Sequence, residues 1–543
     1  MFGLMQDRPL LVSSLIEYAA SIHGDTEVVS RLADGIHRSS WRTIHTRAKQ
    51  LAKALLALGV KPGDRVATLA WNSHRHLELY YAVSGIGAVL HTVNPRLFPE
   101  QLTYIINHAE DSLLLLDAMF LPLVSKLRPH LSTVKQFVLL ADEAATTPAR
   151  EQLPGLLSYE TLLAGQDADF VWPVFDENTA ASLCYTSGTT GNPKGVLYSH
   201  RSTLLHALAS CMKDILALSS RESVLLIVPM FHANGWGVPY SAAMAGAKLV
   251  FPGAALDGPS VCELLRGEAC TLSMGVPTVW LGLLAHLEKH PEAKPTQLRR
   301  GLIGGSAAAR SLIARLEREL SMEVSHLWGM TEMSPVGTGA LRPRRWDAMS
   351  SDQQLDLKVK QGRVMWGVEM KIVDDNGREL PHDGKAFGLV KVKGPWIAKS
   401  YFKDEGGTII DEDGFFATGD VATIDPEGFM QITDRSKDVI KSGGEWISSI
   451  DLESAALAHP AVQEAAVIGI AHPTWQERPL LLAQLKPGTT ATRDELMAVL
   501  TQKVAKWWLP DDILFVSELP HTATGKLNKL KLRELYRDYK LPT

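Results

Sequence analysis

Short apolar runs alternate with amphipathic stretches through the middle of the chain, from about residue 180 to about residue 330. Apolar residues recur with a helical period in residues 309–320, where three leucines and an isoleucine fall on one face. A second helix is expected over 202–218, and buried strands are expected at 179–186, 224–229, 247–252 and 324–328. This alternation predicts an α/β fold with a largely buried sheet.

The pattern changes along the chain and indicates more than one domain. An earlier unit has the same style, with a helix ending near residue 58 and a strand at 65–71. After about residue 360, short strands at 369–375 and 389–394 are separated by Gly and Asp turns. A compact α+β segment follows residue 434, with helices at 451–458 and 493–505 and strands at 465–471 and 479–485. We predict a large domain over 1–434, a connection at 435–438 and a small domain over 439–543.

Composition narrows the function classes. The chain has 543 residues, 45% of them hydrophobic and 21% charged, which excludes a disordered protein. The net charge of -5 gives no basic excess, so nucleic acid is not expected as a partner. The 4 cysteines form no CxxC pair, which favours a reducing, cytoplasmic location without zinc. No apolar run of spanning length exists and the N-terminus lacks a basic start, so neither a membrane span nor a signal peptide is expected.

The strongest chemical signal is a segment rich in glycine and hydroxyl groups, YTSGTTGNPKGV at 185–196. Glycine lets the backbone approach an anion, its N–H groups and the hydroxyls can donate to phosphate, and Lys194 adds a positive charge. A plain surface turn is the alternative, although the segment directly follows an apolar strand, where α/β ligand loops lie. Because Gly195 follows Lys194, the pattern is not that of a P-loop nucleotidase.

This segment resembles the phosphate loop of the adenylate-forming superfamily, which includes acyl-CoA synthetases, firefly luciferase and peptide-synthetase adenylation domains. The resemblance continues in order through WGMTE (328–332), TGD (418–420), DRSKDVIKSGGE (434–445) and PHTATGK (520–526). It implies a large N-terminal domain of mixed sheets flanked by helices, with a small β-barrel-like part, and a small, mobile α+β C-terminal domain. It also implies ATP, Mg²⁺ and coenzyme A as reactants or cofactors.

The resemblance assigns a nucleotide site. The phosphates would be held by Thr186, Ser187, Gly188, Thr189, Thr190, Gly191, Lys194 and Thr331, and Mg²⁺ by Thr186 and Glu332. The adenine would be bound or surrounded by Gly305, Ser306, Ala307, His326, Trp328 and Gly329. The sequence GGSAAA departs here from many relatives, which carry Ala or Glu after the glycines. Asp420, an acceptor with two oxygens, would bind the ribose together with Arg435.

The C-terminal motifs imply the catalytic residues. Lys526 would contact the carboxylate and the α-phosphate during adenylation, Lys437 would be the hinge, and Lys441 would contact nucleotide in a second conformation. Gly443 and Gly444 would let pantetheine pass close to the backbone, with Trp446 beside them.

The segment PMFHANGWG at 229–237 resembles the family's aromatic-histidine motif, which lines the channel for the acid substrate. It assigns His232, Trp236, Gly237 and Gly304 to the substrate channel, with Trp236 resembling the gating tryptophan of some fatty acyl-CoA synthetases. A core role for His232 or Trp236 is the alternative. The chain as a whole most resembles fatty acyl-CoA ligases, and this resemblance implies a medium- to long-chain fatty acid as substrate, a role in fatty acid metabolism and a homodimer. A short thioether acid, 3-methylthiopropionate, is the second candidate; carrier-protein adenylation, a luciferase and a non-catalytic nucleotide-binding protein are more distant ones.

Overall fold

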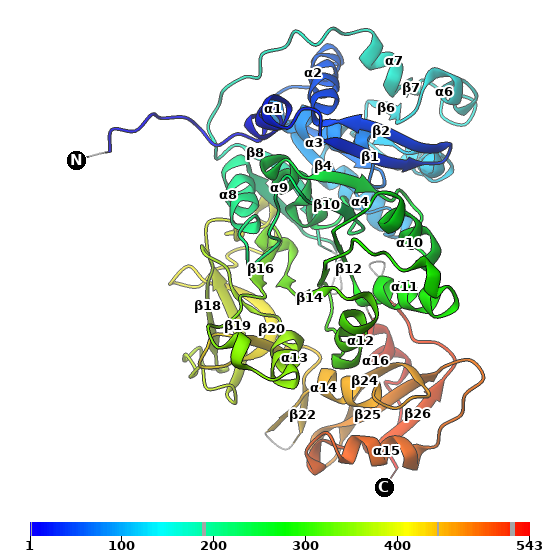
Figure 1. Ribbon diagram of the computed structural model, residues 1–543, viewed down its shortest axis with the longest axis vertical. Helices are drawn as coiled ribbons and strands as arrows, with labels where there is room; N and C mark the ends of the chain where they lie inside the picture. Colours follow the sequence, from blue (N-terminus) through cyan, green and yellow to red (C-terminus); the bar gives the residue numbers. More distant parts are fainter. Residues whose placement is uncertain (2, 187–191, 443–444, 522–526, 543) are drawn as a thin grey trace.

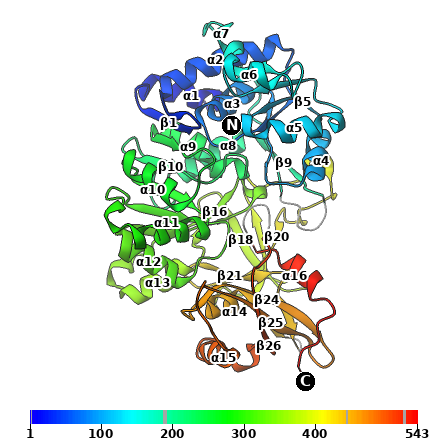
Figure 2. The same cartoon turned by 90° about the vertical axis from the view of Figure 1, so that its right-hand side faces the viewer.

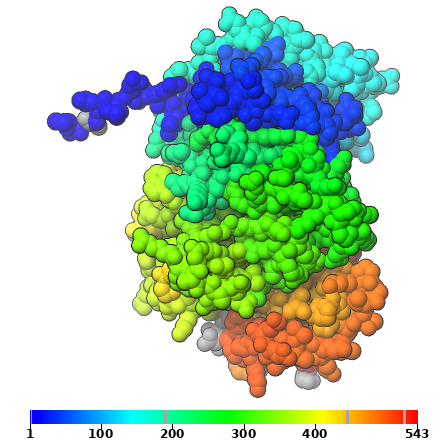
Figure 3. Space-filling view, in the orientation of Figure 1, coloured from blue at the N-terminus to red at the C-terminus, as the bar shows by residue number. Residues whose placement is uncertain are grey.

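The computed structural model describes residues 1, 3–186, 192–442, 445–521 and 527–542. Its parts follow one another along the long axis, as Figure 1 shows: the N-terminal elements lie at one end, the elements of residues 200–340 in the middle, and the C-terminal part at the other end. The view turned by 90° gives the same order (Figure 2). In the space-filling view the C-terminal part sits directly beneath the middle part (Figure 3).

Two seven-stranded sheets dominate the described part of the N-terminal region. The first has the order β14 (Glu323–His326), β13 (Arg300–Ile303), β12 (Leu272–Gly275), β10 (Ser223–Leu226), β11 (Lys248–Phe251), β1 (Glu27–Leu32) and β2 (Gly35–Ser40). The second has the order β7 (Leu157–Ser158), β6 (Gln136–Leu139), β5 (Asp111–Leu116), β3 (Arg65–Leu69), β4 (Val89–Thr92), β8 (Ala180–Tyr185) and β9 (Gly195–Ser199). Both sheets are parallel except for one antiparallel edge pair, β1–β2 in the first and β8–β9 in the second.

Helices cover both faces of these sheets. They are α1 (Val12–Ile22), α2 (Trp41–Ala57), α3 (His74–Gly85), α4 (Pro99–Ala109), α5 (Leu121–Leu127), α6 (Glu143–Ala149), α7 (Tyr159–Ala164), α8 (His200–Ser210), α9 (Val238–Ala245), α10 (Gly258–Gly267), α11 (Pro277–Lys289) and α12 (Arg310–Leu320). Successive residues of a strand point to opposite faces of its sheet and therefore enter different hydrophobic cores. Leu113 in the second sheet and Val224 in the first belong to the largest core, which also contains residues of α1, α2, α3, α8 and α9. Their neighbours Leu114 and Leu225 belong to two other cores, with residues of α4 and α10 respectively. The largest core therefore fills the space between the two sheets.

Two small antiparallel sheets follow and make up the β-rich part of the large region. One contains β15 (Trp328–Gly329), β16 (Val336–Gly339) and β17 (Arg363–Val364), and α13 (Ser351–Val359) precedes its last strand. The other contains β18 (Glu369–Val373), β19 (Phe387–Lys393), β20 (Phe416–Ile424) and β21 (Met430–Arg435). Both fold class and mixed-sheet architecture agree with the prediction from sequence.

The C-terminal part has its own sheet and its own core. Its strands are β23 (Glu445–Ile447), β22 (Ile440–Ser442), β25 (Gln476–Leu485) and β24 (Val462–His472), and β26 (Asp512–Val516) pairs with β25. Its helices are α14 (Ser449–Ala456), α15 (Arg493–Thr501) and α16 (Lys529–Leu535). The chain passes from the β20–β21 sheet into this sheet within four residues, 436–439.

The expected strands at 65–71, 224–229, 247–252, 369–375 and 389–394 each overlap an observed strand, and the helix expected at 309–320 is α12. The helix expected over 202–218 is wrong at its end, because α8 stops at Ser210. Beyond it the chain turns back, with the Leu216 amide donating to the Ser210 carbonyl and Ala217 at a φ of 50°. Ile215 and Leu216 are thereby buried in the core. Among the described residues, no helix has the length and hydropathy that crossing a bilayer would require.

Candidate active site

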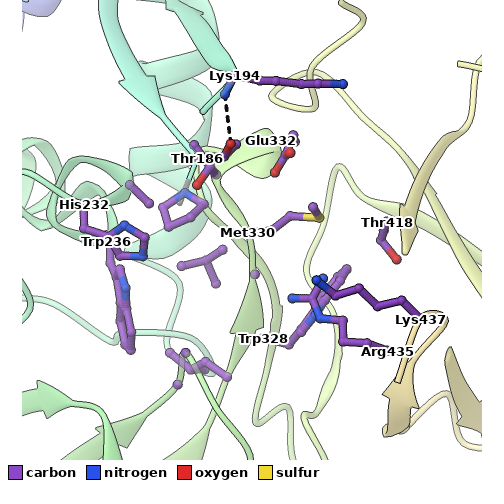
Figure 4. Close-up of a pocket in the computed structure, with 18 of the residues that line it drawn as sticks. Thr186, Lys194, His232, Trp236, Trp328, Met330, Glu332, Thr418, Arg435 and Lys437 are labelled. Carbon is purple, nitrogen blue, oxygen red and sulfur yellow. Dashed lines mark hydrogen bonds between the residues drawn. The ribbon is translucent and has the colours of Figure 1, made fainter. Parts of the chain in front are cut away.

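A cavity of about 420 Å³ lies where the β8–β9 pair, the β15–β16 turn, the 435–438 connection and the start of α16 meet. Twelve of the described residues predicted from sequence line it: Thr186, Lys194, His232, Trp236, Gly304, Gly305, Trp328, Gly329, Thr331, Glu332, Arg435 and Lys437. Figure 4 shows His232 and Trp236 at one side of this space, Arg435 and Lys437 at the other, and Thr186 and Glu332 between them. The cavity therefore brings together motifs that are up to 251 residues apart in sequence, from Thr186 to Lys437.

Thr186 and Lys194, which flank the predicted phosphate loop, are fixed at the base of an antiparallel hairpin. Strand β8 ends at Tyr185 and strand β9 begins at Gly195, and these two residues are paired. The Lys194 amide donates to the Thr186 hydroxyl at 3.1 Å, and the Thr186 amide donates to the Lys194 carbonyl at 2.9 Å (Figure 4). The strand ends thus hold the two flanks of the loop side by side at the cavity wall.

Glu332 is a buried carboxylate in a 3-10 turn, η5 (Thr331–Met333), at the same end of the cavity. Burial raises its pKa, and a hydrogen bond from the Tyr401 phenol to Glu332 Oε1, 2.6 Å long, opposes that rise. The Lys194 ammonium lies over the Tyr401 ring, 4.9 Å from its centroid. Tyr401 is not among the residues predicted from sequence, because it lies outside the motifs; its contacts with Lys194 and Glu332 single it out.

Asp420 lies behind the cavity wall and binds two residues that do line it. Its Oδ2 accepts a hydrogen bond from the Trp328 indole at 2.9 Å, and its Oδ1 lies 2.7 Å from the Arg435 guanidinium. Asp420 and Arg435 are direct partners in the β20–β21 ladder, so the fold itself sets this ion pair. Asp420 is 1% exposed, and each of its two oxygens contacts one of these residues, Trp328 or Arg435, in this structure.

The end of the cavity lined by His232 and Trp236 contains an unusual backbone. All five residues of η3 (Ala233–Gly237) have positive φ, from 37° at Ala233 to 73° at Gly237. Such angles are unfavourable for non-glycine residues, and the buried Asn234 side chain holds the turn through Thr92 and Ser182. This turn places the Trp236 ring against Gly304, where a Cβ atom would lie 2.7 Å from the indole. Only glycine therefore fits beneath Trp236.

Other predicted residues lie outside the cavity lining. Ser306, Ala307 and Gly237 do not line it, and Lys441 lies on β22, paired with Trp446. His326 is buried behind the wall, with its ring nitrogens 2.9 Å from the Val359 carbonyl and 3.4 Å from that of Ser306, and burial lowers its pKa. Ser187, Gly188, Thr189, Thr190, Gly191, Gly443, Gly444 and Lys526 lie outside the described residues, and only the backbone of Trp446 is described.

Two family models match this chain: the AMP-binding enzyme model over residues 16–402 and the AMP-binding enzyme C-terminal domain model over residues 451–526. The chain belongs to the AMP-binding enzyme family. It is 52% identical over 539 residues to the 3-methylmercaptopropionyl-CoA ligase of Ruegeria lacuscaerulensis, covering 99% of both chains. It is 51% identical to the medium-chain-fatty-acid–CoA ligase of Ectopseudomonas oleovorans, covering 99% of this chain and 98% of the relative. It is 48% identical to the long-chain-fatty-acid–CoA ligase of Thermus thermophilus, covering 98% and 97%.

Solved structures agree over nearly the whole chain. The anthranilate CoA ligase AuaEII in complex with anthranoyl-AMP is similar with a TM-score of 0.87 and 26% identity, covering 98% of this chain and 99% of that one. ATP-bound MatB from Rhodopseudomonas palustris is similar with a TM-score of 0.82 and 26% identity, covering 97% and 100%. The fold of an adenylate-forming enzyme, expected from the motifs, is thereby confirmed.

Proposed function

We propose that this protein is an AMP-forming acyl-CoA synthetase that uses ATP and Mg²⁺ to convert a carboxylic acid and coenzyme A into an acyl-CoA, AMP and pyrophosphate. One observation carries the proposal: a single cavity is lined by Thr186, Lys194, Trp328 and Glu332 from the large part and by residues 527–530, which directly follow Lys526. Relatives that are about half identical over their full length carry names of this activity.

The charges of the cavity suit the attack of a carboxylate on the α-phosphate of ATP. Such a reaction needs positioning and cations more than a protein nucleophile. Lys194 and the amides of the 186–194 loop would bind the β- and γ-phosphates, and Arg435, oriented by Asp420, would face the ribose. Trp328, held by Asp420 through its indole, would present a fixed aromatic face to adenine.

Mg²⁺ fits the donors present at the phosphate end. Mg²⁺ is usually bound by one or two protein oxygens together with substrate phosphates and water. The buried Glu332 carboxylate and the Thr186 hydroxyl both line the cavity and supply such oxygens. The described residues contain no cluster of three or more metal-binding side chains, which this mode does not require. When bound, Mg²⁺ would neutralise phosphate charge.

The two steps would use two orientations of the C-terminal part. Lys526 would act during adenylation, and the face around Lys441, Gly443 and Gly444 would act during transfer to CoA, with rotation at Lys437. Residues 1–434, 435–438 and 439–543 would then be the large domain, the hinge and the small domain. The four-residue passage between two separate sheets at 436–439 supports this division.

For the acid we propose a medium- to long-chain fatty acid, with 3-methylthiopropionate as the second candidate. The second candidate is favoured by a specific observation: the Trp236 ring lies against Gly304 and limits the cavity at its proposed acyl end, which favours a short acid. We infer that a longer chain would need the Trp236 ring to leave that position. His232, beside it in the lining, would border the same channel.

The deciding experiment is a panel of acids from C3 to C18, including 3-methylthiopropionate, scored by kcat/KM with ATP, Mg²⁺ and free CoA. We expect pyrophosphate release with acid and ATP, and thioester only when free CoA is present. Thioester on a carrier protein but not on CoA would favour the carrier-protein adenylation alternative. Absence of pyrophosphate with every acid would overturn the proposal.

We also propose that the protein is located in the cytoplasm and forms a homodimer. All 4 cysteines are free thiols, three of them buried, which is compatible with a reducing compartment. Sedimentation of the purified protein tests the oligomeric state directly.

A further inference from the structure

Tyr401 makes two contacts with charged residues of the cavity at the same time. Its phenol donates to Glu332 Oε1 at 2.6 Å, and its ring face carries the Lys194 ammonium 4.9 Å from the centroid. Among the described residues, neither Lys194 nor Glu332 forms an ion pair. Figure 4 shows the Lys194 side chain and Glu332 at the same end of the cavity.

The position of Tyr401 is set by the surrounding backbone. The Ala398 amide donates to the Glu332 carbonyl at 2.8 Å, and the Ser334 hydroxyl donates to the Trp396 carbonyl at 3.0 Å. The segment leading to Tyr401 therefore runs along the Glu332 turn. The Tyr401 ring also packs on the small apolar cluster of Cys184, Val196 and Tyr198 in the β8–β9 pair, the hairpin whose ends carry Thr186 and Lys194.

The phenol and the ring face of Tyr401 offer two different contacts, one to Glu332 and one to Lys194. An aromatic ring attracts a cation through its face, whereas a carboxylate accepts a hydrogen bond at the phenol edge. One tyrosine can therefore bind both charges without neutralising either.

We propose that Tyr401 is a positioning residue that keeps Lys194 and Glu332 apart, so that the two do not form a direct ion pair and both stay available to the nucleotide. The inference rests on the proposed function, which assigns Lys194 to phosphate and Glu332 to Mg²⁺. A direct pair would cancel the charge that each offers, because opposite charges in a partly buried site attract strongly.

Two variants separate the two contacts. Tyr401→Phe removes the hydrogen bond to Glu332 and keeps the ring beneath Lys194, whereas Tyr401→Leu removes both and the spacer as well. Tyr198→Phe is the matched control, because Tyr198 lies in the same cluster but donates to the Thr331 carbonyl rather than to a carboxylate.

The measurement is the Kd of ATP by titration calorimetry, without acid, once with Mg²⁺ and once with EDTA. If the wild-type protein does not bind ATP, the proposed function fails. If it does bind ATP, the variants test the role of Tyr401 alone. We expect Tyr401→Phe to weaken ATP binding with Mg²⁺ by about tenfold and to leave binding in EDTA unchanged. Tyr401→Leu should weaken both by about tenfold or more. Tyr198→Phe should change neither.

The decisive arm is a rescue. When Glu332→Gln is combined with Tyr401→Leu, the anion that would pair with Lys194 is removed, so ATP binding in EDTA should return to within about threefold of wild type. The proposal is overturned if Tyr401→Leu alone binds ATP in EDTA like wild type, or if the added Glu332→Gln does not restore binding. Should Tyr401→Leu prevent folding, Tyr401→Phe decides: equal weakening with Mg²⁺ and with EDTA would refute the assigned contact.

Discussion

Lys529 of α16 lies 2.7 Å from Glu453 of α14, and each side chain is only about a tenth exposed, at 11% and 12%. Lys529 also donates to the Ser449 hydroxyl, and Asp434 at the end of β21 adds to its negative surroundings. Burial raises the pKa of Glu453 from 4.5 to about 7, while Lys529 opposes the rise. One lysine thus neutralises carboxylates from both sides of the 436–439 connection.

Lys529→Met should destabilise the C-terminal part by roughly 3–5 kcal/mol at pH 8, because a buried carboxylate then loses its partner. The loss should shrink at lower pH. The pKa of Glu453 when folded, about 7, exceeds its unfolded value of 4.5, so between these values the folded state binds more protons and gains stability as the pH falls. At pH 6 Glu453 is largely protonated in wild type too, and Lys529 attracts it less.

The measurement is Tm at pH 6 and pH 8 for wild type and Lys529→Met. We expect the Tm difference to be at least twice as large at pH 8. Lys531→Met is the matched control, since Lys531 lies two residues further along α16 and is exposed. An equal difference at both pH values would show that the ionised Glu453 is not what Lys529 stabilises.

The sequence predicted the elements with strong periodicity or turn residues. The helix at 309–320 was correct because its apolar face is a local feature of the sequence. The end of α8 was not predictable, because residues 211–216 carry no Gly or Pro and leave the helix only so that Ile215 and Leu216 can pack in the core. The pairing of β1 with β11, more than 200 residues further on, is set by tertiary packing alone.

The candidate site shows the same division. Motifs identified Lys194, Trp328 and Glu332, since each lies in a local pattern, and the structure brings them to one cavity. Tyr401 belongs to no motif and reaches Glu332 across 69 residues. The five consecutive positive φ angles at 233–237 were likewise not predictable, because Ala and Trp disfavour them and tertiary contacts, among them packing against Gly304 and the Asn234 hydrogen bonds, help to maintain them.

Trp236→Ala should shift acid preference toward longer chains. Removing the indole opens space beside Gly304, and each additional buried methylene is worth about 0.8 kcal/mol, or roughly fourfold in kcat/KM. The ratio of kcat/KM for octanoate to that for 3-methylthiopropionate should rise at least tenfold. Trp366→Ala is the control, because Trp366 is 64% exposed and does not line the cavity. An unchanged ratio would mean that Trp236 does not limit chain length.

Lys526→Ala should abolish adenylation while leaving the fold intact. Lys526 lies outside the described residues, but the segment 527–530 that follows it lines the cavity, which supports a role at the reacting phosphate. Loss of a preorganised donor costs about 10²–10³ in rate, and more for a full charge. Thioester formation from synthetic acyl-adenylate and CoA should survive much better. Equal loss in both half-reactions would contradict the division of labour between the two orientations.

Lys437→Pro should have the opposite effect to Lys526→Ala: adenylation should survive, and transfer of the acyl group to CoA should be slowed. The connection is a tight turn in which the Ser436 amide donates to the Gly419 carbonyl and the Asp438 and Val439 amides donate to the Arg435 carbonyl. Rotation of the C-terminal part about Lys437 requires a large change in φ or ψ there, and proline fixes φ near −65°. Lys437 is not among the residues with positive φ, so the backbone of the present orientation does not by itself exclude proline.

The expected result is near-normal pyrophosphate release and acyl-adenylate formation, with transfer to CoA slowed at least tenfold, measured in single turnovers of each step. Lys437→Ala is the matched variant: it keeps backbone freedom and removes only a side chain that lines the cavity, so any loss should fall on both steps alike. Wild-type thioester formation in the proline variant, or an alanine variant that loses the transfer step as selectively as proline, would place the hinge elsewhere. Loss of both steps in the proline variant would instead mean that proline is incompatible with the adenylation arrangement as well.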